Sequence, residues 1–137
     1  MAGAVAYVNT DESAIIENQY NGSVSVLFDN GLNVTLAGGQ REMIASNREE
    51  SLFYYAKLGY KADFFAIGTT ALALDYGRFN DLAQNDDEAD TFALMAVQNL
   101  TKLGTELYIG FRLYDLERPG SDFDEINAVL TGARIKF

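Results

Sequence analysis

The 137-residue sequence contains no cysteine, no histidine and no tryptophan, and it has a single proline, Pro119. Without cysteine, disulfides and thiolate metal sites are excluded. Without histidine, the commonest general base is missing and a Ser-His dyad is impossible. The sequence also lacks any run of 18 apolar residues, which a membrane-spanning helix needs. These absences argue against most enzyme classes, and we predict a protein that is not an enzyme and has no cofactor.

Positive charge is also scarce, because the formal net charge is −10. Nucleic-acid binding requires a basic surface, so a nucleic-acid partner is not expected. The acidic residues gather in polar segments between apolar stretches. The basic residues instead lie largely within or at the ends of those stretches: Arg41, Lys57, Lys61, Arg112, Arg134 and Lys136.

The apolar stretches alternate between two kinds of side chain, as the last eleven residues illustrate. One face would carry Val129, Thr131, Ala133, Ile135 and Phe137, and the other Leu130, Gly132, Arg134 and Lys136. Successive side chains of a strand point to opposite sides, so this pattern predicts a strand with one apolar and one polar face. Several consecutive segments of about ten residues repeat it, which favours a membrane-spanning β-barrel. A soluble β-sandwich has the same period and is the alternative.

The chain divides into about eight such strands. Six are expected at 2–8, 22–28, 32–41, 51–61, 64–76 and 91–100, and two more in the last third. Long polar loops at 9–19, 42–50 and 79–89, with a fourth in the last third, alternate with short turns such as Asp29-Asn30-Gly31. We therefore predict an all-β fold, an antiparallel transmembrane β-barrel forming one domain over residues 1–137. Its short turns would be periplasmic and its long loops extracellular.

One block carries a resemblance to a known family. Residues 104–137, GTELYIGFRLYDLERPGSDFDEINAVLTGARIKF, resemble the C-terminal hairpin of Gram-negative outer-membrane porins, with a Thr-Glu-Leu-Tyr-x-Gly-x-Arg strand, an Asp-rich loop and a last strand ending on Phe137. Weaker similarity extends through SVSVLFDNGLNVTLAGGQRE, SLFYYAKLGYK and LDYGRFNDLA. Those porins are about twice as long, so the chain resembles only their C-terminal half.

The resemblance implies passive diffusion of small hydrophilic solutes or ions across the bacterial outer membrane. It implies that Phe137 is part of the signal recognised by the barrel-assembly machinery. It further implies contact with outer-membrane lipid and lipopolysaccharide, and a homo-oligomer that is commonly a trimer in this family.

The inward-facing strand residues are the first candidate site. We expect the lumen to be lined by Arg41, Lys57, Lys61, Asp75, Glu106, Tyr108, Arg112, Tyr114, Arg134 and Lys136. In a wide barrel these charges would set ion selectivity. In a closed eight-stranded barrel they would fill the interior as a paired network, and the protein would have a structural or surface-interaction role. A third hypothesis is a soluble barrel that binds a small ligand in its mouth.

The acidic segment Asp86, Asp87, Glu88 and Asp90 is the second candidate site. Clustered carboxylates are ligands for Ca²⁺ or Mg²⁺, but the spacing differs from that of an EF-hand loop. We therefore predict no metal site and favour a solvated acidic loop.

Overall fold

The computed structural model describes residues 2–9, 16–44 and 47–135. Within these ranges the chain forms eight β-strands and one short 3₁₀ helix, η1 (Thr101–Leu103). The strands are β1 (Ala2–Asn9), β2 (Ile16–Leu27), β3 (Leu32–Met43), β4 (Ser51–Phe65), β5 (Gly68–Asn80), β6 (Glu88–Leu100), β7 (Thr105–Glu117) and β8 (Ile126–Ile135). The prediction of an all-β chain with eight strands is confirmed.

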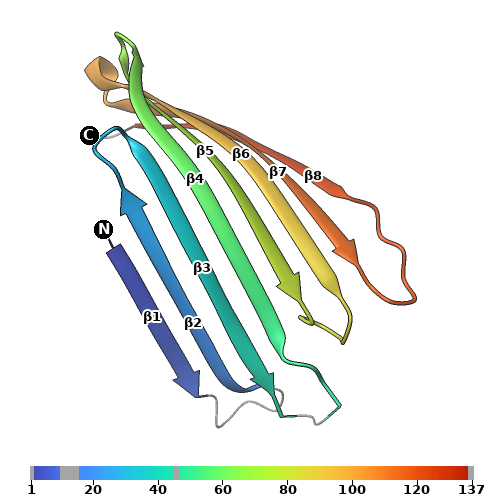
Figure 1. Ribbon diagram of the computed structural model, residues 1–137. Coiled ribbons are helices and arrows are strands. Elements are labelled where there is room, and N and C mark those ends of the chain that lie inside the picture. The colour runs from blue at the N-terminus through green and yellow to red at the C-terminus, as the bar shows by residue number, and fades with distance from the viewer. Residues whose placement is uncertain (1, 10–15, 45–46, 136–137) are drawn as a thin grey trace.

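The strands form one sheet in which every strand pairs with the next along the chain. All seven pairings are antiparallel, and the spatial order is β1 to β8 without a crossover. Figure 1 shows this meander as a twisted sheet of long, tilted strands. Because consecutive strands run in opposite directions, all short turns lie at one end of the sheet and all long loops at the other.

The turn between β2 and β3 illustrates how local sequence fixes the hairpins. Gly31 has φ of +87°, a conformation that glycine adopts without steric cost. The Asn30 side chain accepts a hydrogen bond from the Leu32 backbone amide at 3.1 Å. The Phe28 amide then donates to the Leu32 carbonyl at 2.8 Å, which closes the hairpin. The Asn-Gly pair therefore sets the register of β2 against β3.

Several strands are longer than their apolar segments predicted. β2 begins at Ile16, inside the segment expected to be a loop, because polar side chains bond across the strands there. Asn18 Nδ2 donates to Glu42 Oε2 at 2.7 Å, and Arg41 Nε donates to Gln19 Oε1 at 3.2 Å. The predicted strand 64–76 was placed too early, because β4 continues to Phe65 through a register shift after Ala62.

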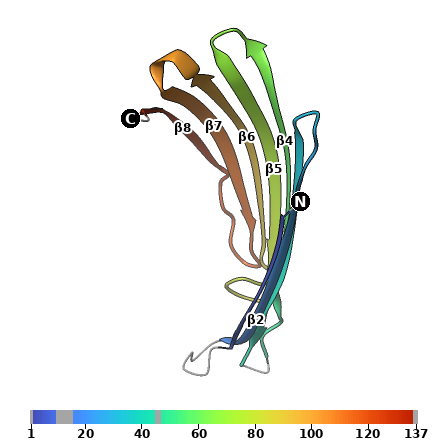
Figure 2. The ribbon, with the colours of Figure 1, turned by 90° about the vertical axis from the view of Figure 1, so that its left-hand side faces the viewer.

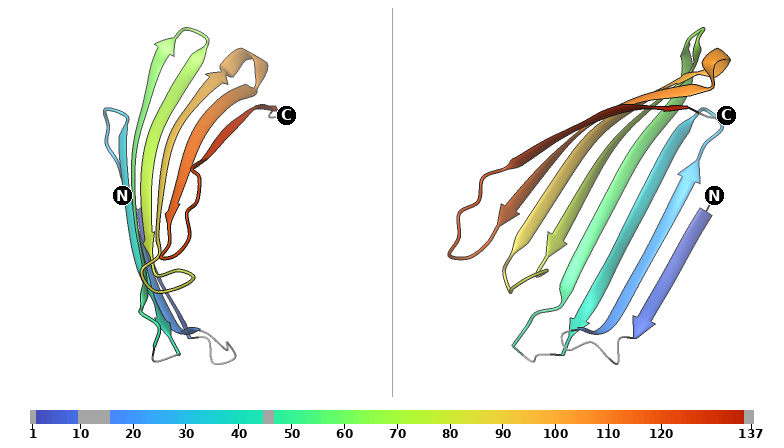
Figure 3. Two further views of the ribbon diagram at one scale, coloured as in Figure 1. Left: turned by 90° about the vertical axis from the view of Figure 1, so that its right-hand side faces the viewer. Right: turned by 180° about the vertical axis from the view of Figure 1, so that it is seen from behind.

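The eight strands form an open sheet and do not by themselves close into the predicted barrel. Among the described residues β1 and β8 do not pair with each other and are the two edges of the sheet. Figures 2 and 3 show the sheet bent into an open trough, with β8 curving away from the plane of β4 and β5. The described residues also include no helix that is both long and apolar enough to cross a membrane.

Candidate functional site: the polar face of the sheet

Strand register assigns each side chain to one of two faces. Residues that pair directly share a face, and one such row runs from Thr35 through Lys57, Asp75, Ala93 and Arg112 to Ala128. We call the face that carries this row the polar face. It carries every described residue that was predicted to line a lumen: Arg41, Lys57, Lys61, Asp75, Glu106, Tyr108, Arg112, Tyr114 and Arg134. Lys136 and Phe137 lie outside the described residues.

The polar face is the more shielded of the two. Asp75 and Ala93 are each only 1% exposed, although they lie on a single sheet. On the opposite face Ile109 is 56% and Val129 70% exposed. Crowded side chains of this kind are expected on the inner side of a curved sheet, and the bend is visible in Figures 2 and 3. The polar side chains therefore lie on the side toward which the sheet curls.

An ion pair spans three strands at the centre of this face. Arg112 on β7 extends across Ala93 on β6, and its Nη2 lies 2.9 Å from Oδ2 of the buried Asp75 on β5. Its Nη1 donates to Thr91 Oγ1 at 3.1 Å. The guanidinium carbon also lies 5.9 Å from the centroid of the Tyr114 ring, a cation–π distance. These contacts hold Arg112 flat along the sheet.

A second ion pair lies near the short-turn end. Glu106 and Arg134 are direct partners of β7 and β8, and Arg134 Nε donates to Glu106 Oε2 at 2.8 Å. Lys57 and Lys61 on β4 differ from these arginines, because neither makes an ion pair with a described residue. The sequence prediction brought all these charges to one face but did not indicate which of them pair.

Aromatic rings on this face lie over glycines of the neighbouring strand. Tyr108 is the register partner of Gly132, and a Cβ at that glycine would be 2.4 Å from the tyrosine hydroxyl. Phe53 covers Gly39 in the same way, with a ring carbon 2.5 Å from an ideal Cβ. The rings therefore lie against the sheet, where a residue larger than glycine would displace them.

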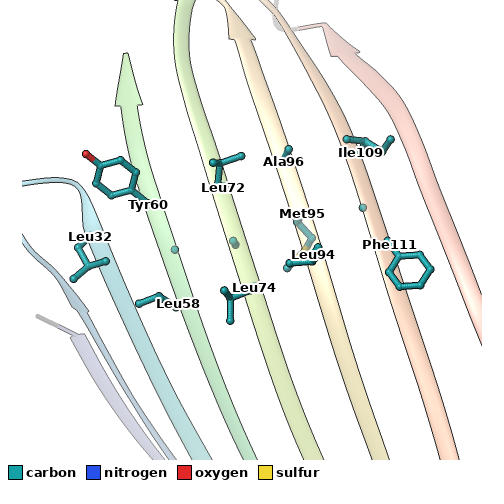
Figure 4. A pocket seen from close by; sticks show the side chains of 13 residues that line it. Leu32, Leu58, Tyr60, Leu72, Leu74, Leu94, Met95, Ala96, Ile109 and Phe111 are labelled. Carbon is teal, nitrogen blue, oxygen red and sulfur yellow. The ribbon is translucent and has the colours of Figure 1, made fainter. Parts of the chain in front are cut away.

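The opposite face is apolar along the middle of the strands. Leu58, Leu74 and Leu94 are register partners on adjacent strands and project from the same side in Figure 4. They border a shallow groove of about 550 Å³. Its other labelled apolar residues on that face are Leu32, Tyr60, Leu72, Ala96, Ile109 and Phe111. We call this the apolar face, and it is exposed on every strand from β3 to β7.

At the end of the strands that leads to the long loops, the apolar face carries tyrosines and then charged residues. Tyr7 and Tyr20 have ring centroids 5.0 Å apart. Tyr76 Oη donates to Asp90 at 2.5 Å, and Arg78 forms ion pairs with Glu88 and Asp90. Every charged residue on the described part of this face lies at this end: Glu42, Arg78, Glu88, Asp90, Asp115 and Glu117.

The acidic segment of the second candidate site is held by arginines. Asp87 is 3% exposed, and its carboxylate accepts hydrogen bonds from the Ala83 and Gln84 amides and from Arg118 Nη2 at 3.1, 3.3 and 3.1 Å. Asp86 has φ of +62° and uses its amide to bond Asp81. With Glu88 and Asp90 bound to Arg78, no group of three acidic residues in the described ranges is arranged to hold a metal ion.

Arg48 joins a third loop to this arrangement. Its guanidinium donates to the carbonyls of Ala83 and Asp81, and the neighbouring Glu49 amide donates to Asn85 Oδ1 at 3.0 Å. We call Arg48, Asp87 and Arg118 the loop clasp, because they connect the loops after β3, β5 and β7. The clasp was not predicted from the sequence, and neither were the positions of Ala93 and Thr91 beneath Arg112. No sequence signal marked them, since their roles follow from strand register and loop conformation.

Comparison with known proteins gives one family. The Gram-negative porin family matches residues 1–118, which is most of the chain. The chain belongs to the Gram-negative porin family. The porin match covers β1 to β7, so the terminal block that carried the resemblance contributes only residues 104–118 to it. No curated protein and no solved structure matches the chain significantly. Porin membership indicates an outer-membrane channel at a coarse level.

Proposed function

We propose that the chain forms the wall of an outer-membrane pore through which small hydrophilic solutes or ions diffuse passively. In this proposal the polar face lines the water-filled lumen and the apolar face contacts lipid. The observation that carries it is the register itself, which from β4 to β7 places exposed leucine, isoleucine and phenylalanine on one face and the charged Lys57, Asp75 and Arg112 on the other. A membrane barrel needs this segregation, apolar outward and polar inward.

The border of the apolar face supports a membrane orientation. Tyrosines prefer the interface between hydrocarbon and water, where the ring is in an apolar layer and the hydroxyl is solvated. Tyr54 and Tyr76 are two such residues, and Arg78, with its ion pairs, is the register partner of Tyr54 and lies one position beyond Tyr76 on the same face of β5. We propose that this border marks the outer surface of the membrane. The long loops would then be extracellular and the short turns periplasmic, as in other bacterial barrels.

The edges of the sheet set a requirement for this function. A bilayer offers no hydrogen-bond partners to backbone amides and carbonyls, so the edges of β1 and β8 must be paired in the membrane. The two strands run in opposite directions. They can therefore pair with each other, or each with a further antiparallel strand, while the long loops stay on one side.

A plugged eight-stranded barrel is the second candidate, and the paired charges favour it. The interior of such a barrel is just wide enough for side chains to fill it. The Arg112–Asp75 and Arg134–Glu106 pairs would suit a filled interior. Lys57 and Lys61 favour the open pore, because sealing unpaired ammonium groups away from water costs several kcal/mol per ion by order of magnitude.

Planar-bilayer conductance of the refolded full chain tests the proposal. Discrete conductance steps that scale with salt concentration are the expected result. A chain that refolds to β-structure in vesicles but produces no steps at any voltage contradicts the pore and favours the plugged barrel. A chain that stays soluble without detergent contradicts both candidates.

A further inference from the structure

The charge of the polar face is opposite in sign to that of the whole chain. Along the paired parts of the described strands this face carries five basic side chains, Arg41, Lys57, Lys61, Arg112 and Arg134, and two acidic ones, Asp75 and Glu106. The chain as a whole has a formal charge of −10. The excess of acidic residues therefore resides in the loops and at the loop end of the apolar face.

The carboxylates of the polar face already have partners. Asp75 is bound by Arg112 and Glu106 by Arg134. A further acid, Asp63, lies in the register shift near the β4–β5 turn and accepts a hydrogen bond from Thr69 Oγ1 at 2.7 Å. Lys57 lies opposite Asp75 in register but forms no ion pair with it, and Lys61 has the neutral Ala71 as its β5 partner. All strand neighbours of these two lysines are among the described residues. Along the middle of the strands and toward the short turns, their positive charges are therefore the ones without an acidic partner among the described residues, whereas Arg41 lies at the loop end of β3 and donates to the neutral Gln19.

The stretch between the two lysines is lined by small neutral residues. Gly59 lies between them on β4 and has Ala73 as its β5 partner, and Ala71 is the β5 partner of Lys61. Four residues along a strand separate the two lysines by about 13 Å. An anion on the polar face could thus approach both ammonium groups in sequence without displacing a bulky side chain, and each group attracts it by direct electrostatics.

The acidic loops do not cancel this effect at moderate salt. Lys57 lies six residues from Ser51, the loop end of β4, which corresponds to about 20 Å along the strand. The Debye length is about 10 Å at 0.1 M salt, so the loop charges are largely screened at Lys57. The local charge of the polar face therefore decides which ions are favoured along the middle of the strands.

We propose that Lys57 and Lys61 make the pore select small inorganic anions over cations, with chloride as the simplest example. This inference rests on the proposed pore function, and it names the class of solute that the pore prefers. Arg112 contributes less, because Asp75 neutralises its charge, and Arg134 contributes less because Glu106 does the same.

The test is the reversal potential of the pore in a potassium chloride gradient across a planar bilayer. The unmodified chain should give a potential of the sign expected for a chloride-preferring channel. The double variant Lys57→Glu/Lys61→Glu should lower the chloride-to-potassium permeability ratio by about fivefold or more, from the Coulomb energy of reversing two nearby charges. Lys57→Gln/Lys61→Gln should shift the ratio in the same direction by a smaller factor. Conductance steps in each variant show that it has folded.

Lys102→Glu is the matched control. It changes the net charge as much as Lys57→Gln/Lys61→Gln does, but in η1, outside the strands, and should leave the ratio within experimental error of the unmodified chain. An unmodified chain without conductance overturns the pore function and this inference with it. A conducting chain that prefers potassium overturns only the inference. A lysine double variant that changes the ratio no more than Lys102→Glu also overturns the inference and leaves the pore intact.

Discussion

Arg112 and Asp75 are 37 residues apart in sequence, yet Nη2 of the arginine lies 2.9 Å from Oδ2 of the carboxylate. They are on strands β7 and β5, which are separated by β6, and the arginine side chain passes over Ala93 on β6. The contact thus ties three strands together on the face we propose to line the pore. The contribution of this ion pair to the free energy of unfolding can be measured, because Arg112 and Ala93 can each be replaced separately.

Replacing Arg112 should destabilise the fold more than replacing Lys57. Arg112→Ala leaves the buried Asp75 carboxylate without its cationic partner, a loss of about 3 kcal/mol for a buried pair. Lys57→Ala removes a cation that is the register partner of the same aspartate but is not ion-paired, and should cost about 0.5 kcal/mol or less. Urea unfolding in detergent, followed by circular dichroism, measures both. Equal losses for the two variants would show that the ion pair adds nothing.

A larger side chain at Ala93 should also destabilise the fold, because it would disturb the Arg112–Asp75 ion pair. Ala93→Leu places a branched side chain where Arg112 crosses β6, so the arginine must leave Asp75, and overpacking of this kind costs about 1–3 kcal/mol. Ala96→Leu makes the same change on the apolar face of the same strand and should be close to neutral. The same unfolding experiment compares the two. A larger loss for Ala96→Leu would contradict the assignment of faces on β6.

The loop clasp should protect the long loops from hydrogen exchange and from proteolysis. Asp87→Ala removes the carboxylate that holds Arg118 and the amides of Ala83 and Gln84. We expect faster hydrogen exchange at those two amides and faster cleavage of the loop by a non-specific protease, with the strands unaffected. Asp122→Ala, an exposed acid in the loop after β7, is the control and should change neither rate. Unchanged exchange in Asp87→Ala would mean that the clasp does not order the loop.

Two glycines with positive φ should respond differently to alanine. Gly120 has φ of +77° and no atom within 4 Å of an added Cβ, so Gly120→Ala pays only the backbone cost of about 1–2 kcal/mol. A Cβ on Gly31 would lie 2.1 Å from the Lys61 carbonyl oxygen, so Gly31→Ala must also shift the β3–β4 contact. Unfolding midpoints should therefore fall further for Gly31→Ala. A smaller effect at Gly31 would contradict this turn geometry.

The alternation of apolar and polar residues was sufficient to predict the strands and their faces. Successive side chains of any strand point to opposite sides, because the backbone geometry requires it. It placed Lys57 and Arg112 on the same side, and the structure agrees. It did not predict that β2 extends to Ile16, since the polar Asn18 and Gln19 resemble loop residues until their partners on β3 are known. The sequence also did not predict which carboxylate pairs with Arg112. Arg112 could have paired with any inward carboxylate, and only the register and the small size of Ala93 select Asp75.

The open sheet and the loop clasp could not be predicted from the sequence, for a different reason. Closure depends on how strongly the whole sheet bends, a property spread over all strands and not encoded in any one segment. Arg48 lies in a polar loop with no periodic pattern, so its contacts with Asp81 and Ala83, more than 30 residues away, had no local signal.

The central claim is that one face of this sheet lines water and the other contacts lipid, and single cysteines test it most directly. The chain has no native cysteine, so each introduced thiol is the only one present. Lys57→Cys and Leu58→Cys place thiols on adjacent residues of β4 that point to opposite faces. In the chain refolded into lipid vesicles, a water-soluble, membrane-impermeant thiol reagent should modify Lys57→Cys and leave Leu58→Cys unreacted. Rapid modification of Leu58→Cys with protection of Lys57→Cys would contradict the account.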